Sequence, residues 1–109
     1  MLKIVIEQNT LIGSIKECEV VNDNTYLDIH YHKNIFPNYK IISLEVLLPI
    51  NIPNEKVTNK IKKEYLNVIN KMYNTLKYTD YDKINNSYLK SILIYYLNEY
   101  GLSYDGNMF

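Results

Sequence analysis

The spacing of the apolar residues changes once along this chain, between Pro49 and Pro53. Before Pro49, apolar and polar residues alternate over short segments rich in β-branched side chains, as in half-buried strands. After Pro53, apolar residues recur every three or four positions, as on one face of a helix. The sequence therefore predicts an α+β fold in which a sheet comes first and helices follow.

The first half predicts four antiparallel strands, at 2–7, 11–21, 25–32 and 39–50. The sequence Asn-Asp-Asn at 22–24 tolerates a left-handed backbone, so we expect the second and third strands to pair as a hairpin. Gly13 is a candidate for a β-bulge. In the fourth strand, one face is expected to carry Ile42, Leu44, Val46 and Leu48.

Two helices are expected in the second half, giving the order ββββαα with both helices packed on one face of the sheet. The first spans 55–78, and Asn54 is suited to cap it. Thr79 and Asp82 resemble a capping box that opens a second helix, which ends before Gly101. The whole chain, 1–109, is expected to form one domain with a short tail over 101–109.

The second expected helix is apolar around more of its circumference than one packed face requires, with Ile94 nearly opposite the other apolar residues. Either this helix is sandwiched between the sheet and the first helix, or its outer face meets a partner. Tyrosine offers a large contact area at a small entropy cost and is enriched at interfaces. We therefore expect a protein-binding surface formed by Tyr88, Ile94, Tyr95, Tyr96 and Tyr100.

Asp28, His30 and His32 alternate along the third expected strand and therefore share one face, with side chains about 7 Å apart. Two imidazoles at this spacing could hold a metal ion if a third ligand came from elsewhere. The alternative is that these residues form the solvent face of a sheet covered on one side only. The intervening residues, Leu27, Ile29 and Tyr31, are then expected to be buried.

The His-Tyr-His sequence at 30–32, followed by tyrosines on a helix, resembles the HUH single-strand endonucleases of replication initiators and small transposases. In that family the histidines hold a divalent metal and a tyrosine attacks DNA. The resemblance implies a metal at His30 and His32, and Tyr65, Tyr73 or Tyr88 as the nucleophile.

Charge and composition restrict the classes of partner. Twelve lysines balance twelve acidic residues, and there is no arginine to offer a planar bidentate fork to phosphates or guanine edges, so nucleic acid is not the expected partner. Arginine, alanine and tryptophan are missing, whereas asparagine, isoleucine, lysine and tyrosine are abundant. This bias follows AT-rich codons and indicates a low-GC bacterium, its phage or a mobile element.

A single cysteine, Cys18, excludes an internal disulfide and fits a reducing cytosol, so we expect a cytoplasmic protein without a membrane span. Cys18 could be a nucleophile with His30 as its base if their strands were neighbours, whereas a buried, inert thiol is the alternative. Glu17 and Glu19 suggest an acid/base pair, and solvated edge charges explain them equally well.

The favoured interpretation is a small non-catalytic protein-binding module that needs no cofactor. Its composition suits an accessory protein of a phage or mobile element, such as an inhibitor of a host defence complex. Two alternatives remain open: a metal-dependent nuclease that uses His30 and His32, and a structural subunit that forms a homodimer through the tyrosine-rich helix.

Overall fold

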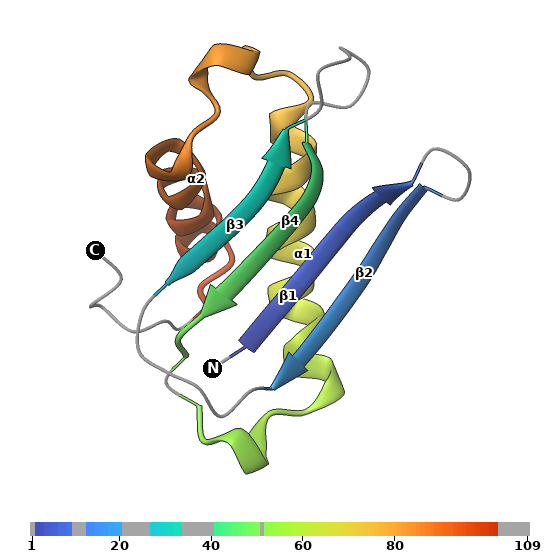
Figure 1. The fold of residues 1–109 in the computed structure, drawn as a ribbon. Helices are drawn as coiled ribbons and strands as arrows, with labels where there is room; N and C mark the ends of the chain where they lie inside the picture. Colours follow the sequence, from blue (N-terminus) through green and yellow to red (C-terminus); the bar gives the residue numbers. More distant parts are fainter. Residues whose placement is uncertain (1, 10–12, 21–26, 34–40, 51, 103–109) are drawn as a thin grey trace.

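The computed structural model describes residues 2–9, 13–20, 27–33, 41–50 and 52–102. They confirm the order ββββαα, with a short 3₁₀ turn ahead of each helix (Figure 1). The elements are β1 (Leu2–Asn9), β2 (Gly13–Val20), β3 (Asp28–Lys33), β4 (Ile41–Leu48), η1 (Asn54–Lys56), α1 (Asn59–Leu76), η2 (Tyr81–Lys83) and α2 (Asn86–Glu99).

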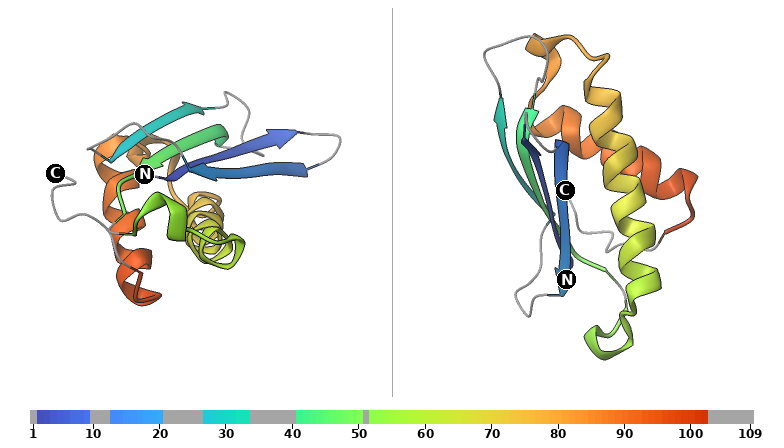
Figure 2. Two further views of the ribbon diagram at one scale, coloured as in Figure 1. Left: turned by 90° about the horizontal axis from the view of Figure 1, so that it is seen from below. Right: turned by 90° about the vertical axis from the view of Figure 1, so that its right-hand side faces the viewer.

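The molecule has two layers. Figure 1 looks onto the face of the sheet that the helices leave uncovered, and Figure 2 shows both helices on the opposite face. α1 packs against β1 and β2, whereas α2 contacts α1 and the edge strand β3. α2 therefore lies beside α1 on the sheet and is not sandwiched between the sheet and α1.

The strands are all antiparallel and lie in the order β2-β1-β4-β3. The predicted pairing of the second strand with the third is therefore wrong, because β3 pairs with β4 and the chain crosses from one edge of the sheet to the other. The turn at 22–24, on which that prediction rested, lies outside the described residues. β2 and β3 form the two edges of the sheet, and both carry charged residues, which discourage pairing with other chains.

One core lies between the sheet and the two helices. β1 and β4 supply Leu2, Ile4 and Leu44, none of which is exposed to solvent. Leu27 and Ile29 are buried and Tyr31 is partly buried, as the alternation along β3 predicted. The helices close the core with Tyr65, Val68, Ile69, Met72, Tyr73, Leu76, Leu89, Leu93 and Leu97.

The predicted face of β4 is confirmed for Leu44, Val46 and Leu48, while the side chain of Ile42 is outside the description. The strand ends at Leu48, directly before Pro49, which cannot donate a ladder hydrogen bond. No irregularity of pairing occurs at Gly13, which faces Asn9 in regular register. The irregularity lies instead between His32 and Lys33.

Both predicted helix caps are wrong by several residues, and for the same reason. Asn54 opens the turn η1, and α1 is capped by Thr58, whose side chain accepts a hydrogen bond from the Ile61 amide at 3.3 Å. The residue before that cap, Val57, is extended and packs on the core. An extended apolar residue just before the cap fixes the direction in which the chain enters the helix.

At the second helix, Thr79 and Asp82 do not form the cap. Asn85 caps α2, its side chain accepting a hydrogen bond from the Tyr88 amide at 2.8 Å. Ile84 precedes it in an extended conformation and is only 1% exposed, so its burial decides where the helix begins. The end of α2 agrees with the prediction, since Gly101 follows with a φ of 64°, which favours glycine.

A polar contact also links the sheet edge to the segment between the helices. The Lys33 ammonium donates a hydrogen bond to the Tyr81 carbonyl at 3.1 Å and lies 4.6 Å from the centre of the Tyr81 ring. Both interactions hold the end of β3 against η2. The Lys33 ammonium therefore lies over one face of the Tyr81 ring, and 41% of the surface of Tyr81 remains exposed.

Candidate functional site

The apolar and aromatic residues of α2 and its C-terminal cap lie in two environments, the buried core and the exposed surface. Leu89, Leu93 and Leu97 are spaced four residues apart and are fully buried. Tyr95 and Tyr100 face outward with 57% and 51% of their surface exposed. An apolar ring that remains this accessible after folding is free to contact another molecule.

The hydroxyl groups of two other tyrosines of α2 are hydrogen-bonded to threonines, one on α1 and one in the segment that follows α1. The Tyr96 hydroxyl lies 2.7 Å from Oγ1 of Thr75, and the Tyr88 hydroxyl lies 2.9 Å from Oγ1 of Thr79. Each threonine hydroxyl also donates to a carbonyl of α1, Thr75 to Lys71 and Thr79 to Thr75. Since a hydroxyl has one hydrogen to donate, the tyrosines must donate to the threonines.

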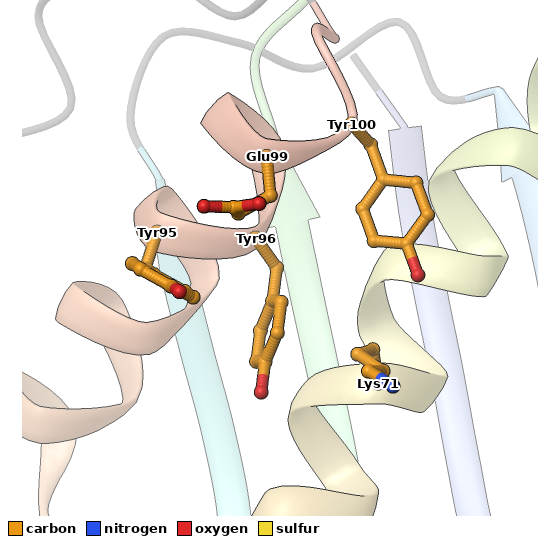
Figure 3. Close-up of a pocket in the computed structure, with 5 residues that line it drawn as sticks. All are labelled: Lys71, Tyr95, Tyr96, Glu99 and Tyr100. Carbon is orange, nitrogen blue, oxygen red and sulfur yellow. The ribbon is translucent and has the colours of Figure 1, made fainter.

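A groove runs between the two helices near the C-terminal end of α2 (Figure 3). One section has a volume of about 440 Å³ and is lined by Lys71, Tyr95, Tyr96, Glu99 and Tyr100. A second section, of about 210 Å³, is lined by Glu64, Asn67, Tyr100 and Leu102. Tyr100 lines both sections, and we call the two sections together the interhelical groove.

The α2 wall of the interhelical groove is aromatic. The rings of Tyr95 and Tyr96 meet edge to face, with centroids 5.2 Å apart and planes inclined at 78°. The hydrogen bond to Thr75 fixes Tyr96, and Tyr96 in turn supports Tyr95. This wall is therefore partly rigid before anything binds, which lowers the entropy cost of association.

The α1 wall is polar. Glu64, Asn67 and Lys71 follow one another at steps of three and four residues and so lie on one stripe of the helix. Among the described residues, no ion pair involves Glu64, Lys71 or Glu99. In Figure 3, Glu99 lies toward Tyr95, while Lys71 lies below Tyr100. The groove thus offers unpaired charges of both signs beside an aromatic surface.

The structure brings three of the five predicted binding residues together: Tyr95, Tyr96 and Tyr100 line the groove. Tyr88 and Ile94 line neither section; both are partly buried and pack on the core. The residues of the α1 wall were not predicted. Their only local signal is the spacing of Glu64, Asn67 and Lys71, which also describes any solvated helix face.

Asp28, His30 and His32 lie on the uncovered face of the sheet, and both histidines are exposed. The His30 Nε2 atom lies 2.8 Å from the Asp28 carboxylate, and Glu45 is the cross-strand partner of His30. Even so, within the described residues no three histidine, cysteine or acidic side chains are placed to hold a metal. In the described part of the uncovered face, His30 and Asp28 form a polar contact, and no third ligand joins them to complete a metal site.

The tyrosines that the resemblance to HUH endonucleases requires lie on the other side of the sheet from these histidines. Tyr65 and Tyr73 are buried at 1% and 7% exposure in the core between sheet and helices. Tyr88 also packs on that core, and its hydroxyl is bound to Thr79. The sheet would therefore separate each of these three tyrosines from a metal held by His30 and His32.

Cys18 cannot work with His30, because their strands lie at opposite edges of the sheet, about 14 Å apart across three strand spacings. Burial raises the pKa of the Cys18 thiol, with a further rise from Glu19 that Lys62 opposes. The thiol form is favoured, and the proposed nucleophile–base pair is wrong. On the same strand Glu19 is exposed and lies 3.8 Å from Lys3, as expected of a solvated pair.

In the described residues, no helix has the length and apolar character needed to cross a bilayer. Comparisons with protein-family models, with curated proteins and with solved structures found no match to this chain.

Proposed function

We propose that this chain is a non-catalytic protein-binding module whose contact surface is the interhelical groove. The observation that carries the proposal is the exposure of Tyr95 and Tyr100 above a groove whose opposite wall is polar. Aromatic anchors surrounded by polar groups are typical of protein interfaces. Tyr96 supports the surface from below through its bond to Thr75.

The composition supports an origin in a phage or mobile element of a low-GC host, since it lacks arginine, alanine and tryptophan and is rich in asparagine, lysine and tyrosine. A small accessory protein from such a source has host protein complexes as natural targets. An inhibitor of a host defence complex fits this proposal, because inhibition needs binding and no chemistry. Cytoplasmic action is part of the same proposal.

The test places a photo-crosslinking amino acid at Tyr100 in one variant and at Tyr78 in a matched control, expressed in a low-GC bacterium. Tyr78 is 89% exposed and outside both sections of the groove, so it samples random encounters. We expect a discrete adduct from position 100 that is absent from position 78 and weakened by Tyr95→Ala. The same adducts from both positions would contradict the proposal. An adduct containing only this chain would point to the homodimer instead.

A further inference from the structure

The two ends of the groove's α1 wall differ in charge. Glu64 lies in the section with Asn67 and Leu102, and Lys71 lies in the section with the tyrosines. Seven residues of helix separate the two charged residues by about 10 Å along the axis. The wall therefore runs from a carboxylate, past an amide, to an ammonium.

From this polarity we infer that the occupant is a peptide segment of another protein that carries a basic residue, an apolar or aromatic residue and an acidic residue in that order along the groove. The inference rests on the function proposed above and names the chemistry of its partner. The basic residue faces Glu64, and the apolar residue covers Tyr100 at the junction. The acidic residue faces Lys71 on the α1 wall, away from Glu99, which lies toward Tyr95 (Figure 3).

The length of the wall sets the spacing of these residues. An extended chain rises about 3.3 Å per residue, so charges about 10 Å apart are three or four positions apart in the peptide. The exposed ring of Tyr100 lines both sections and so lies where the residues between the two charges must pass. An apolar residue there buries surface that water now covers.

A single nucleic-acid strand fits this groove less well. Stacking on Tyr95 and Tyr100 is available to bases, and Lys71 is available to one phosphate. However, Glu64 lines the other section of the groove, which holds no lysine among its described lining residues, and would repel the neighbouring phosphates of the strand. The charges within the groove therefore favour a peptide of mixed sign.

The experiment selects ligands from a phage-displayed library of random dodecapeptides and measures the affinity of the enriched peptides by fluorescence anisotropy. Wild type is compared with Tyr100→Ala, with the control Tyr78→Ala, and with a charge-swapped variant that combines Glu64→Lys and Lys71→Glu. Both swapped side chains line an open groove on an exposed helix face, and the swap leaves the net charge unchanged. Circular dichroism checks that each variant is folded.

We expect enriched peptides to carry the basic, apolar and acidic residues in this spacing and to lose affinity for Tyr100→Ala but not for Tyr78→Ala. The charge-swapped variant should bind them about tenfold more weakly, because two attractions become repulsions. Peptides with their own two charges exchanged should regain that affinity.

Other outcomes separate the inference from the proposed function. Peptides that depend on Tyr100 but ignore the charge swap would overturn the inference and leave the function standing. A library that yields no Tyr100-dependent peptide would count against both. Displacement of the peptides by oligothymidylate at low micromolar concentration would overturn the inference in favour of a nucleic-acid ligand.

Discussion

The hydroxyl oxygens of Tyr96 and Thr75 lie 2.7 Å apart across the interface between α1 and α2. Thr79, three residues after the end of α1, and Tyr88 repeat the arrangement at 2.9 Å. The two bonds therefore tie α2 to α1 and to the segment that follows α1. The Tyr96–Thr75 bond holds the helices together beside the interhelical groove, which Tyr96 lines.

Removing the Tyr96 hydroxyl should therefore cost stability. We expect Tyr96→Phe to lower the free energy of unfolding by about 1 kcal/mol, since the bond is partly buried and neutral. Urea denaturation measures the change. A double-mutant cycle with Thr75→Val should show coupling, and Tyr95→Phe, whose ring is exposed, should change little. Equal losses from Tyr95→Phe and Tyr96→Phe would show that the bond does not stabilise the pair of helices.

The two observed caps give a second prediction. Thr58→Ala and Asn85→Ala should each destabilise the protein by about 1 kcal/mol, because each leaves an amide at a helix N-terminus without its side-chain acceptor. Asn86→Ala is the matched control: Asn86 is the first residue of α2 and is exposed. Thermal unfolding followed by circular dichroism should separate the variants. A loss at Asn86 as large as that at Asn85 would argue against the cap.

The loss of stability caused by substitutions along α2 should depend on the burial of each side chain and not on its hydrophobicity. Leu93→Ala should cost about 3 kcal/mol, because it opens a cavity in the core. Ile94→Lys should cost roughly 1 to 2 kcal/mol, since Ile94 packs partly on the core, whereas Tyr95→Ala should cost less than about 0.5 kcal/mol. Chemical denaturation of the three variants tests this order. Full stability in Ile94→Lys would place that side chain at the surface.

Alkaline pH should destabilise the fold through two groups. Burial raises the pKa of Tyr65, with a smaller contribution from Glu64, and burial also raises the pKa of Cys18. The unfolded chain loses these protons first, at ordinary values of about 8.5 for cysteine and 10 for tyrosine. The contribution of these two protonated groups to the free energy of unfolding is complete below those values. It is lost as the pH rises through the raised pKa values that the groups have in the folded protein.

The pH dependence of unfolding between about 8 and 11 measures this loss. Tyr65→Phe should flatten the slope near the upper end, and Cys18→Ala should flatten it near the lower end. The slope is the quantity to compare, since either substitution can also shift the absolute stability. A slope unchanged in both variants would assign alkaline unfolding to other groups.

The sequence predicted the faces of the elements well because burial follows local periodicity. The burial of Ile29 follows from the polar residues on either side of it in the strand, and the alternation along β4 predicts the burial of Leu44, Val46 and Leu48 in the same way. Neither prediction requires knowledge of the rest of the chain. The strand order could not be predicted in the same way. Which strand lies beside β1 depends on pairing between distant segments. The turn residues at 22–24 led instead to the wrong prediction that the second and third strands pair as a hairpin.

The predicted helix caps were wrong and the α1 wall of the groove was not predicted, and the two reasons are related. More than one asparagine or threonine lies near each helix start, and the choice among them depends on where Val57 and Ile84 meet the core. The α2 tyrosines of the groove were predicted from their residue type, but their α1 partners depend on the crossing angle of the helices. That angle follows from contacts such as Tyr96 with Thr75, which no local pattern contains.

The strand order also has a consequence for synthesis on the ribosome. β1 lies inside the sheet, between β2 and β4. β2 follows β1 directly along the chain, whereas β4 is the last of the four strands to be synthesised. Until β4 emerges, the backbone groups of Leu2 to Glu7 that will pair with it have no partner within the sheet. Unpaired strand edges recruit other chains. The nascent protein is therefore most exposed to mispairing during the interval between the translation of its first hairpin and that of β4.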